Sequence, residues 1–571
     1  MFVLREMLIS CLPYSRLYFL SFVCLFLTNA FMALIPLLVK EAIDRDVIAG
    51  LNGNFLYYPA LILLVAVFLA AFRIASRILI YRACREQEHD LREKLMQKIL
   101  SAKASVLNQA TRGDLITNML EDTTQVRLLV GFGFVQAGNI LLLYGISLPF
   151  MLQISPILTL YCVAPYPILL IWVAYLNQRL YHLNLEVKQW QGELADFTTQ
   201  SIHGIHVIHS HNSRESMAEE YKRRVDSHYQ ASWKAARLDI IMLPGMIFLA
   251  SLGEWAVIRY GVPMIQSGLI TRGDFLALHG YIGYLLFASI SVGFGVSTFN
   301  RGYTSMQRLL NRYAMEEEKG QGEALGFNQV EYEFQSLEFC YPLQPKPALK
   351  VDHLKFSSLQ TVGVFGPIGS GKSTFFRLLM GFFIPDQGKI FVNQEILGEK
   401  NLAQLRASVV YVSQELFLFS RSIRDNLDFY GNHSDEEIQD AIDFACLRED
   451  IEGFKDGLMT LVGERGVRLS TGQKQRIAIA RAWLRKPALM ILDDCFSALD
   501  TVVEEKILKN LMAQRGDGGL IISSHRISTL KHCQRILVFK GHTIEGDGTH
   551  TELMKKNEYY RTNYELQRDF V

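Results

Sequence analysis

The residues most suited to chemistry form a glycine-rich run, GPIGSGKST, at positions 366–374. An apolar stretch, residues 361–365, precedes this run and an amphipathic stretch, residues 375–380, follows it, which predicts a strand, a loop and the start of a helix. In such a loop the backbone N–H groups turn inward around phosphate oxygens, and the helix N-terminus adds partial positive charge. We expect Lys372 to reach the terminal phosphates and the Ser373 hydroxyl to bind Mg²⁺. The run therefore predicts a site for ATP or GTP. The nine residues are Gly366, Pro367, Ile368, Gly369, Ser370, Gly371, Lys372, Ser373 and Thr374.

Other polar and aromatic residues stand where they can complete such a site. Tyr341 precedes the run and has a ring that can stack on an adenine. Gln414 follows a second apolar stretch, in VVYVSQ, where its amide can touch the shell of the metal. Asp493 and Asp494 end a fully apolar stretch, the usual position of a carboxylate that orders Mg²⁺. His525 ends another buried stretch, IISSH.

A further motif, LSTGQ at residues 469–473, opens a predicted helix. It presents backbone N–H groups and a hydroxyl to an anion. Together these patterns favour a phosphate-binding α/β domain in the last 240 or so residues of the chain.

Composition separates the two halves of the 571-residue chain, because nearly all of the long uncharged runs precede residue 300. A net charge of +1 provides no field for capturing a nucleic acid, so a nucleic-acid partner is not expected. The eight cysteines are far apart and form no CxxC pair, which argues against a disulfide framework or a zinc site.

Six apolar runs are long enough to cross a membrane, which takes about 20 residues. They lie near residues 15–39, 55–80, 130–154, 156–177, 239–262 and 274–298. The first is too long for a signal peptide and five similar runs follow it, so we expect it to be retained. Residues 1–13 are expected to form a short helix on the inner leaflet.

Basic residues set the predicted orientation. They concentrate in the polar stretches between the second and third runs and between the fourth and fifth, so both stretches and the N-terminus are expected inside. The apolar spacing of Leu91, Leu95 and Ile99 stays helical, which predicts that the membrane helices continue into the cytosol. Residues 315–328 are charged and glycine-rich and read as a linker.

This series of motifs resembles the nucleotide-binding domain of ATP-binding cassette (ABC) transporters, and the six runs before it resemble the exporter membrane domain. The resemblance rests on the glycine-rich run, the signature at 469–473, the Walker B stretch at 488–494, Ser497–Asp500 and His525, all in order. It implies an all-α membrane domain of six helices with long cytoplasmic extensions, fused to a cytosolic α/β P-loop domain. The implied boundaries are 1–314 for the membrane domain, 315–328 for the linker and 329–571 for the nucleotide-binding domain.

Two short segments of the membrane half and one loop carry the resemblance further. Residues 111–116 and 201–208 are similar to the intracellular loops whose coupling helices rest on the ATPase domains of exporters. The loop at 462–467, VGERGV, is typical of exporters within the family. The chain is also similar to bacterial multidrug-resistance-like half-transporters that pair with a different chain.

The resemblance also implies a division of roles across a head-to-tail dimer. The P-loop with Tyr341 would bind one ATP, Ser373, Gln414 and Asp493 would hold Mg²⁺, and Asp494, His525 and Gln414 would act in catalysis. The remaining residues would serve the nucleotide held by the partner chain or the contact with it: Ser470, Gly472, Gln473 and Asp500.

Two positions depart from the family pattern. Asp494 stands where most members have glutamate, and a carboxylate one methylene shorter reaches about 1.5 Å less far toward the attacking water. A positioned base is worth ~10²–10⁴-fold, so this site is expected to bind ATP and hydrolyse it slowly unless the backbone adjusts. Thr471 replaces the usual glycine, which we expect to be tolerated because its side chain can point away.

The resulting hypothesis is an ATP- and Mg²⁺-driven exporter of hydrophobic or amphipathic compounds in a bacterial inner membrane, with a heterodimer favoured. Two alternatives stay open: a homodimeric lipid or peptide exporter, and a membrane regulator that binds ATP without transport. No domain precedes the first run, which disfavours an exporter with an N-terminal peptidase. Glu254 and His279 are ionisable groups at membrane depth that could pair or bind a cationic substrate. The histidines at 203, 206, 209 and 211 are expected to lie on a solvated face rather than to bind a metal.

Overall fold

The computed structural model describes residues 2–47, 56–107, 110–318, 326–341, 344, 346–429, 431–463, 469–514 and 518–568. The chain forms two compact units, Met1–Leu100 with Ala110–Met315 (unit 1) and Ser101–Gln109 with Glu316–Val571 (unit 2). The described residues 101–107 thus belong to the second unit.

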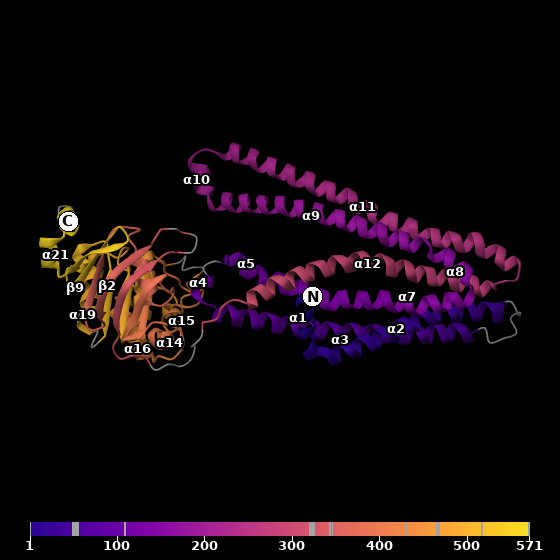
Figure 1. The fold of residues 1–571 in the computed structure, drawn as a ribbon, viewed down its shortest axis with the longest axis horizontal. Helices are drawn as coiled ribbons and strands as arrows, with labels where there is room; N and C mark the ends of the chain where they lie inside the picture. Colours follow the sequence, from indigo (N-terminus) through magenta and orange to yellow (C-terminus); the bar gives the residue numbers. More distant parts are fainter. Residues whose placement is uncertain are drawn as a thin grey trace. The chain divides into compact units, whose positions relative to one another are not determined.

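Unit 1 is helical throughout its described residues, and its long helices lie side by side (Figure 1). Among the described residues, five helical segments are long and apolar enough to cross a membrane, and they overlap the first five predicted runs. The sixth run lies in the 42-residue helix α12. Its elements are α1 (Phe2–Cys11), η1 (Leu12–Tyr14), α2 (Ser15–Ala42), η2 (Ile43–Val47), α3 (Tyr57–Ser101), α5 (Arg112–Thr117), η3 (Asn118–Asp122), α6 (Thr123–Leu128), η4 (Leu129–Gly133), α7 (Phe134–Ile154), α8 (Pro156–Val163), α9 (Pro165–His203), α10 (Ile205–Ser210), α11 (Arg214–Gln266) and α12 (Arg272–Tyr313).

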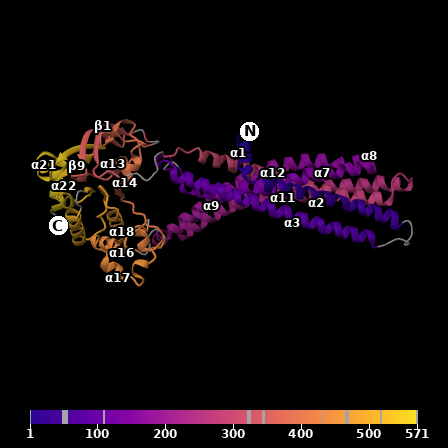
Figure 2. The same ribbon diagram turned by 90° about the horizontal axis from the view of Figure 1, so that it is seen from below.

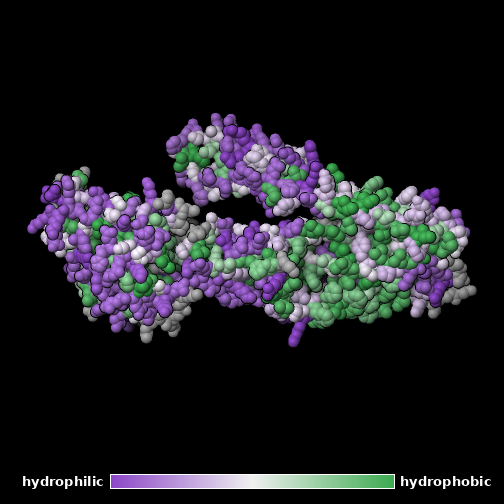
Figure 3. Space-filling view, in the orientation of Figure 1, coloured by the Kyte–Doolittle hydropathy of each residue, from purple (hydrophilic) through white to green (hydrophobic). Residues whose placement is uncertain are grey.

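Several helices of unit 1 extend beyond their apolar runs, as the sequence predicted. Helix α3 is 45 residues long and α11 is 53 residues long, well above the 20 or so that a bilayer requires. Hydrophobic side chains gather on one stretch of the bundle, whereas the paired ends of α9 and α11 near α10 are mostly hydrophilic (Figure 3).

Buried ion pairs join the polar parts of these helices. Asp122 is completely buried and accepts hydrogen bonds from Asn118 Nδ2 at 2.7 Å and Arg308 Nη2 at 2.5 Å. Glu88 is buried among three arginines, Arg85, Arg92 and Arg127. A buried carboxylate is costly unless paired, so these contacts fix how η3 packs on α12 and how α3 packs on α6.

Unit 2 contains two sheets. The larger has the strand order β10-β9-β3-β8-β7-β6 and the smaller the order β2-β1-β4-β5. In the larger sheet β9, β3, β8, β7 and β6 are parallel and only β10 is antiparallel to its neighbour. Helices α16, α17 and α18 gather on one side of the unit, away from β1 and β9 (Figure 2).

Strands β3, β7 and β8 are buried at every residue, in keeping with their continuous apolar sequences. The elements are α4 (Ala104–Leu107), β1 (Glu331–Phe339), β2 (Leu349–Ser357), β3 (Thr361–Phe365), α13 (Lys372–Leu379), β4 (Gln387–Val392), β5 (Glu395–Ile396), α14 (Leu402–Ser408), β6 (Val409–Val412), α15 (Ile423–Leu427), α16 (Asp435–Phe444), α17 (Arg448–Gly453), η5 (Gly457–Met459), α18 (Thr471–Leu484), β7 (Leu489–Asp493), α19 (Thr501–Gln514), β8 (Gly519–Ser523), α20 (Ile527–Leu530), β9 (Arg535–Lys540), β10 (Thr543–Gly548), α21 (His550–Lys556) and α22 (Glu558–Arg568).

Removing the partner of Asp122 tests the buried network. Arg308→Ala is expected to destabilise unit 1 by about 3 kcal/mol, because it leaves a buried carboxylate without its cation. Arg82→Ala, which removes an exposed ion pair with Glu86, is the matched control and is expected to cost under about 1 kcal/mol. Thermal unfolding of both variants in detergent measures the difference, and equal melting temperatures would contradict the assigned role of Asp122.

Candidate nucleotide-binding site

The topology of the larger sheet brings the predicted site residues to one edge. Strands β3, β8, β7 and β6 are adjacent and parallel, so their carboxyl ends meet. The glycine-rich run follows β3, His525 follows β8, Asp494 follows β7 and Gln414 follows β6. Ligands of open parallel sheets bind beyond this edge, so the fold itself assembles these residues.

Backbone conformation explains the glycines of the loop. Gly371 has a φ of +102°, in the region that L side chains rarely adopt, and a Cβ there would lie 2.9 Å from the Ala348 carbonyl oxygen. A Cβ on Gly366 would lie 2.5 Å from the Phe539 carbonyl oxygen. Lys372 begins α13 and donates to the carbonyls of Gly366 at 2.7 Å and Pro367 at 2.9 Å. The lysine thus closes the loop on itself.

A cleft of about 370 Å³ lies over this edge. Most of the predicted binding residues line it: Tyr341, Ile368, Gly369, Ser370, Gly371, Lys372, Ser373, Thr374, Gln414, Asp493, Asp494 and His525. Gly366 and Pro367 contribute their carbonyls to Lys372 instead. Tyr341 lies edge-on to Phe339 and Phe383, with ring centroids 5.1 and 5.4 Å apart, and its hydroxyl is 3.1 Å from Thr374 Oγ1.

The charged groups of the cleft influence one another. Burial lowers the pKa of Lys372, and the carboxylates of Asp493 and Asp494 oppose this effect. Burial raises the pKa of Asp494, against the opposing influence of His525. Burial, with the Lys372 ammonium acting in the same direction, lowers the pKa of His525 below its ordinary value. His525 is therefore neutral at neutral pH and can both donate and accept a hydrogen bond.

Asp493 and Asp494 differ in their surroundings although they are neighbours. Asp493 is buried at the end of β7 and accepts a hydrogen bond from the Tyr411 hydroxyl at 3.1 Å. Asp494 is half-buried, has a φ of +51° and lies 3.4 Å from Gln414 Nε2. The left-handed backbone at Asp494 turns its carboxylate out of line with the strand, toward Gln414.

Two hydroxyls of the cleft suit a phosphate ligand. Ser370 Oγ and Ser523 Oγ are buried, and neither has a hydrogen-bond partner among the described residues. A buried hydroxyl without a partner costs free energy that a ligand with several acceptor oxygens recovers. With Lys372 and the oxygen atoms of Ser373, Gln414 and Asp493, the residues present fit both a nucleotide phosphate and Mg²⁺, which prefers oxygen ligands.

The remaining predicted residues do not line this cleft. Ser470 caps α18: its hydroxyl accepts from Gln473 N at 3.1 Å, and Gln473 Oε1 accepts from Ser470 N at 2.9 Å. Asp500 caps α19 by accepting from Val503 N at 2.9 Å. A Cβ on Gly472 would lie 3.0 Å from the Ala498 carbonyl oxygen, so the signature packs against the residues before Asp500.

Sequence reasoning missed Gln475, which connects these two segments. Gln475 is buried, donates to Ser497 Oγ at 3.2 Å and accepts from Ala498 N at 3.2 Å. It also missed cleft residues that come from outside the motifs: Gln344, Lys346, Pro347, Ala348, Ser523 and His542. Only Ser523 had a sequence signal, because it belongs to the apolar stretch that ends in His525.

The assignment of residues 111–116 to the first intracellular loop stays a prediction. These residues begin a long helix, where Thr111 Oγ1 accepts from Asp114 N at 3.1 Å as an N-terminal cap. The separate short helix is α4. The second predicted segment, 201–208, does contain a separate short helix, α10.

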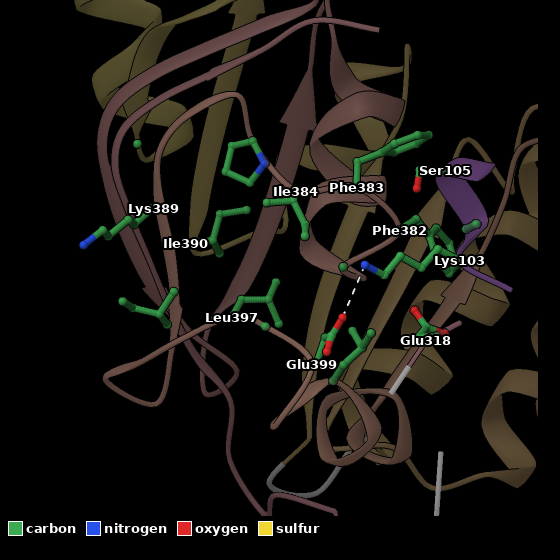
Figure 4. Close-up of a pocket in the computed structure, with 17 residues that line it drawn as sticks. Lys103, Ser105, Glu318, Phe382, Phe383, Ile384, Lys389, Ile390, Leu397 and Glu399 are labelled. Atoms are coloured by element: carbon green, nitrogen blue, oxygen red, sulfur yellow. Dashed lines mark ion pairs between the residues drawn. The ribbon is translucent and has the colours of Figure 1, made fainter. Parts of the chain in front are cut away.

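The segment that leads into α4 is held firmly within unit 2. Lys103 Nζ lies 3.0 Å from Glu316 and 3.3 Å from Glu399, at the rim of a largely apolar pocket of about 130 Å³ (Figure 4). Lys103 N donates to the Glu316 carbonyl at 3.1 Å, and Glu318 N donates to the Ser101 carbonyl at 2.7 Å. Glu318 also pairs with Arg406.

Of three other sequence predictions, two concern residues that the structure describes. Residues 464–467 of the exporter-type loop lie outside the described residues. No group of three or more metal-ligating side chains occurs in the described part of the chain, and His203, His206 and His211 are exposed. Glu254 is half-buried on α11 and His279 is exposed on α12, and no ion pair joins them in the described structure.

Comparisons with known proteins agree on one family. Residues 18–289 match the model of the ABC transporter transmembrane region, and residues 349–497 match the ABC transporter model. A Bacillus subtilis protein described as an uncharacterized ABC transporter ATP-binding protein is 30% identical, covering 97% of this chain and 96% of that one. A probable multidrug resistance ABC transporter ATP-binding/permease protein of the same organism is 29% identical over the same shares. The structure of a bacterial Atm1-family ABC exporter with ATP bound has a TM-score of 0.77 at 21% identity, covering 97% of this chain and 99% of that one.

The loop geometry makes a direct prediction. Gly371→Ala is expected to weaken binding of a fluorescent ATP analogue at least tenfold, because the positive φ and the Ala348 carbonyl together strain any side chain there by ~1–3 kcal/mol. Gly453→Ala is the control, since a Cβ at that position meets no atom within 4 Å. Unchanged affinity in the Gly371 variant would show that the loop does not hold the nucleotide in this conformation.

Proposed function

The chain belongs to the ABC transporter family as a half-transporter, with a membrane domain fused to its ATPase domain, and we propose that it is the slowly hydrolysing subunit of a heterodimeric exporter. The observation that carries the proposal is Asp494, which stands at the position of the catalytic base. The proposed location is a bacterial inner membrane, with the ATPase domain in the cytoplasm, as the bacterial relatives and the distribution of basic residues suggest.

The proposed chemistry at the cleft is phosphoryl transfer from ATP to water. The backbone of residues 366–374 and Lys372 would bind the phosphates, and Ser370 and Ser523 offer free hydroxyls to them. Ser373, Gln414 and Asp493 would hold Mg²⁺, which when bound neutralises the charge that develops on phosphate oxygens. Asp494 would orient the attacking water, and neutral His525 would contact the terminal phosphate.

Geometry supports slow rather than absent hydrolysis. The Asp494 side chain is about 1.5 Å shorter than a glutamate, and its carboxylate is already engaged with Gln414 at 3.4 Å. Burial raises the pKa of Asp494, so its carboxylate accepts a proton more readily than a fully solvated carboxylate would. These features support a site that retains ATP and turns it over rarely.

The separation of the signature from the cleft supports the need for a second chain. Ser470 and Gln473 bond to each other, and Gln473 Nε2 also donates to Asp450 Oδ1 at 2.8 Å, so neither residue bonds to this chain's cleft. The Ser470 hydroxyl, which only accepts in these contacts, would be the group available to a nucleotide on another chain. A partner with a glutamate at its own site would then be completed by this signature. ATP binding would draw the two ATPase domains together and hydrolysis would release them, so that the membrane helices alternate between inward and outward access.

One relative indicates a substrate class for the proposed exporter. Similarity to a probable multidrug resistance transporter favours export of hydrophobic or amphipathic compounds. A homodimeric exporter is the second candidate, and it would require measurable turnover from two aspartate-type sites. ATPase activity of the chain purified alone distinguishes the two.

The heterodimer proposal predicts unequal effects of matched changes. In the co-purified complex, Asp494→Asn is expected to change ATP turnover less than about twofold, whereas replacing the corresponding glutamate of the partner is expected to reduce it ~10²-fold or more. Asp494→Glu should increase turnover. Steady-state phosphate release measures all three variants, and equal losses from the first two changes would refute the asymmetric assignment.

A further inference from the structure

Unit 1 contains a cavity of about 190 Å³ between α2, α3, α7 and α12, lined by both apolar and polar side chains. Its lining includes Thr28 and Asn29 from α2, Arg73, Ser76 and Arg77 from α3, Gln136 and Asn139 from α7, and Ser291 from α12. All four helices carry membrane runs, so this polar lining lies within the predicted membrane-spanning part of the unit.

The two arginines are the unusual feature of the cavity. Arg73 and Arg77 are one turn apart on α3 and lie inside the run predicted to span the membrane, residues 55–80. Like charges at this spacing repel each other. An ionisable side chain at membrane depth is costly, and such residues mark substrate or ion sites by default.

The described carboxylates do not balance these charges. The nearest acids along α3 are already paired: Glu86 with Arg82, and Glu88 with Arg85, Arg92 and Arg127. Arg73 Nη2 donates to Met32 Sδ at 3.6 Å, and a thioether is only a weak acceptor. Among the described residues, no carboxylate forms an ion pair with Arg73 or Arg77.

Helix geometry directs the side chains of Arg73 and Arg77 away from the inner leaflet. Side chains on an α-helix tilt toward its N-terminus. The N-terminus of α3 is Tyr57, and the basic stretch that is expected at the cytoplasmic surface begins near Arg82. The two guanidiniums therefore lean toward the bilayer interior, where both line the cavity.

The other polar groups of the cavity also favour a negative ligand. Asn29 Nδ2 donates to Asn139 Oδ1 at 3.1 Å, which leaves Asn139 Nδ2 as a donor. The amide of Gln136 and the hydroxyl of Ser291 add further donors. The apolar walls, Leu25, Ile140, Leu143 and Phe287, suit a hydrocarbon tail.

We propose that this cavity binds the anionic end of an amphipathic molecule, a carboxylate, phosphate or sulfonate, through Arg73 and Arg77. The inference rests on the proposed export function and specifies its substrate class. The charge is opposite to that of the cationic ligand expected from Glu254 and His279, neither of which lines this cavity. The anion belongs either to an exported compound or to a lipid head group.

Three probes with the same aromatic tail separate charge from hydrophobicity. Pyrenebutyrate, pyrenebutanol and pyrenebutylamine are titrated into the full chain, with any co-purifying partner, in phosphatidylcholine nanodiscs without nucleotide. Because ATP is absent, the result does not depend on hydrolysis, and failure of the proposed ATPase asymmetry would leave it unaffected.

Pyrenebutyrate is expected to bind at least tenfold more tightly than the neutral and cationic probes, and Arg73→Gln with Arg77→Gln is expected to abolish this preference. Each charge-assisted hydrogen bond contributes enough for about a tenfold effect. Arg82→Gln on the same helix is the matched control and should bind like the unchanged protein. Arg73→Lys with Arg77→Lys should retain much of the preference, which distinguishes loss of charge from misfolding.

A lipid arm distinguishes the two sources of the anion. Nanodiscs containing phosphatidylglycerol are compared by native mass spectrometry for lipid retained by the unchanged protein and by the double glutamine variant. If phosphatidylglycerol is retained only when both arginines are present, and if it displaces pyrenebutyrate, the result supports a lipid head group as the bound anion. Pyrenebutyrate binding that phosphatidylglycerol does not displace supports an exported anion. Equal binding of the three probes, together with lipid retention that the glutamine variant leaves unchanged, would overturn the proposal.

Discussion

The cost of burying an unbalanced polar group governs both units of this protein. Where opposite charges or acceptors are available, the structure uses them: Asp122 is paired with Arg308, and Lys372 is held by two carbonyls. Such groups fix packing. Where partners are missing, as at the buried hydroxyls of Ser370 and Ser523, the unbalanced groups line a cavity. In the other unit, the exposed Arg73 and the half-buried Arg77 also line a cavity and form no ion pair with a described carboxylate. The same physical cost therefore stabilises the fold and marks the places where a ligand is needed.

Much of the nucleotide cleft could be predicted because its information is local. The spacing of Gly366, Gly371 and Lys372 within one loop already specifies a phosphate cradle, and the continuous apolar sequences of β3, β7 and β8 specify buried parallel strands. The sequence did not indicate which distant segments of the chain lie close together at the cleft. Lys346, Ala348 and His542 line the cleft through contacts between distant segments, and their types are common on any surface.

Other features were missed because one pattern has two physical meanings. The sequence TRGD fits both a loop that touches another domain and the cap of a helix, and the hydrogen bond from Asp114 N to the Thr111 hydroxyl shows the cap. Arg73 and Arg77 were included in a predicted membrane run, because such a run is assigned from the average hydropathy of about 20 residues, which two charged side chains change little. Gln475 resembles any helical glutamine until its two partners are known. Side-chain environment, rather than secondary structure, is where sequence reasoning fell short.

The double contact of Gln475 has a mechanical consequence. Its amide binds Ser497 and Ala498 at once, and the Ser497 hydroxyl donates to the Asp494 carbonyl at 3.1 Å. A displacement of α18 relative to β7 must therefore either move residues 497–498 as well or break these hydrogen bonds. The helix that begins at the signature and the loop that carries Asp494 are thus linked mechanically within a single polypeptide.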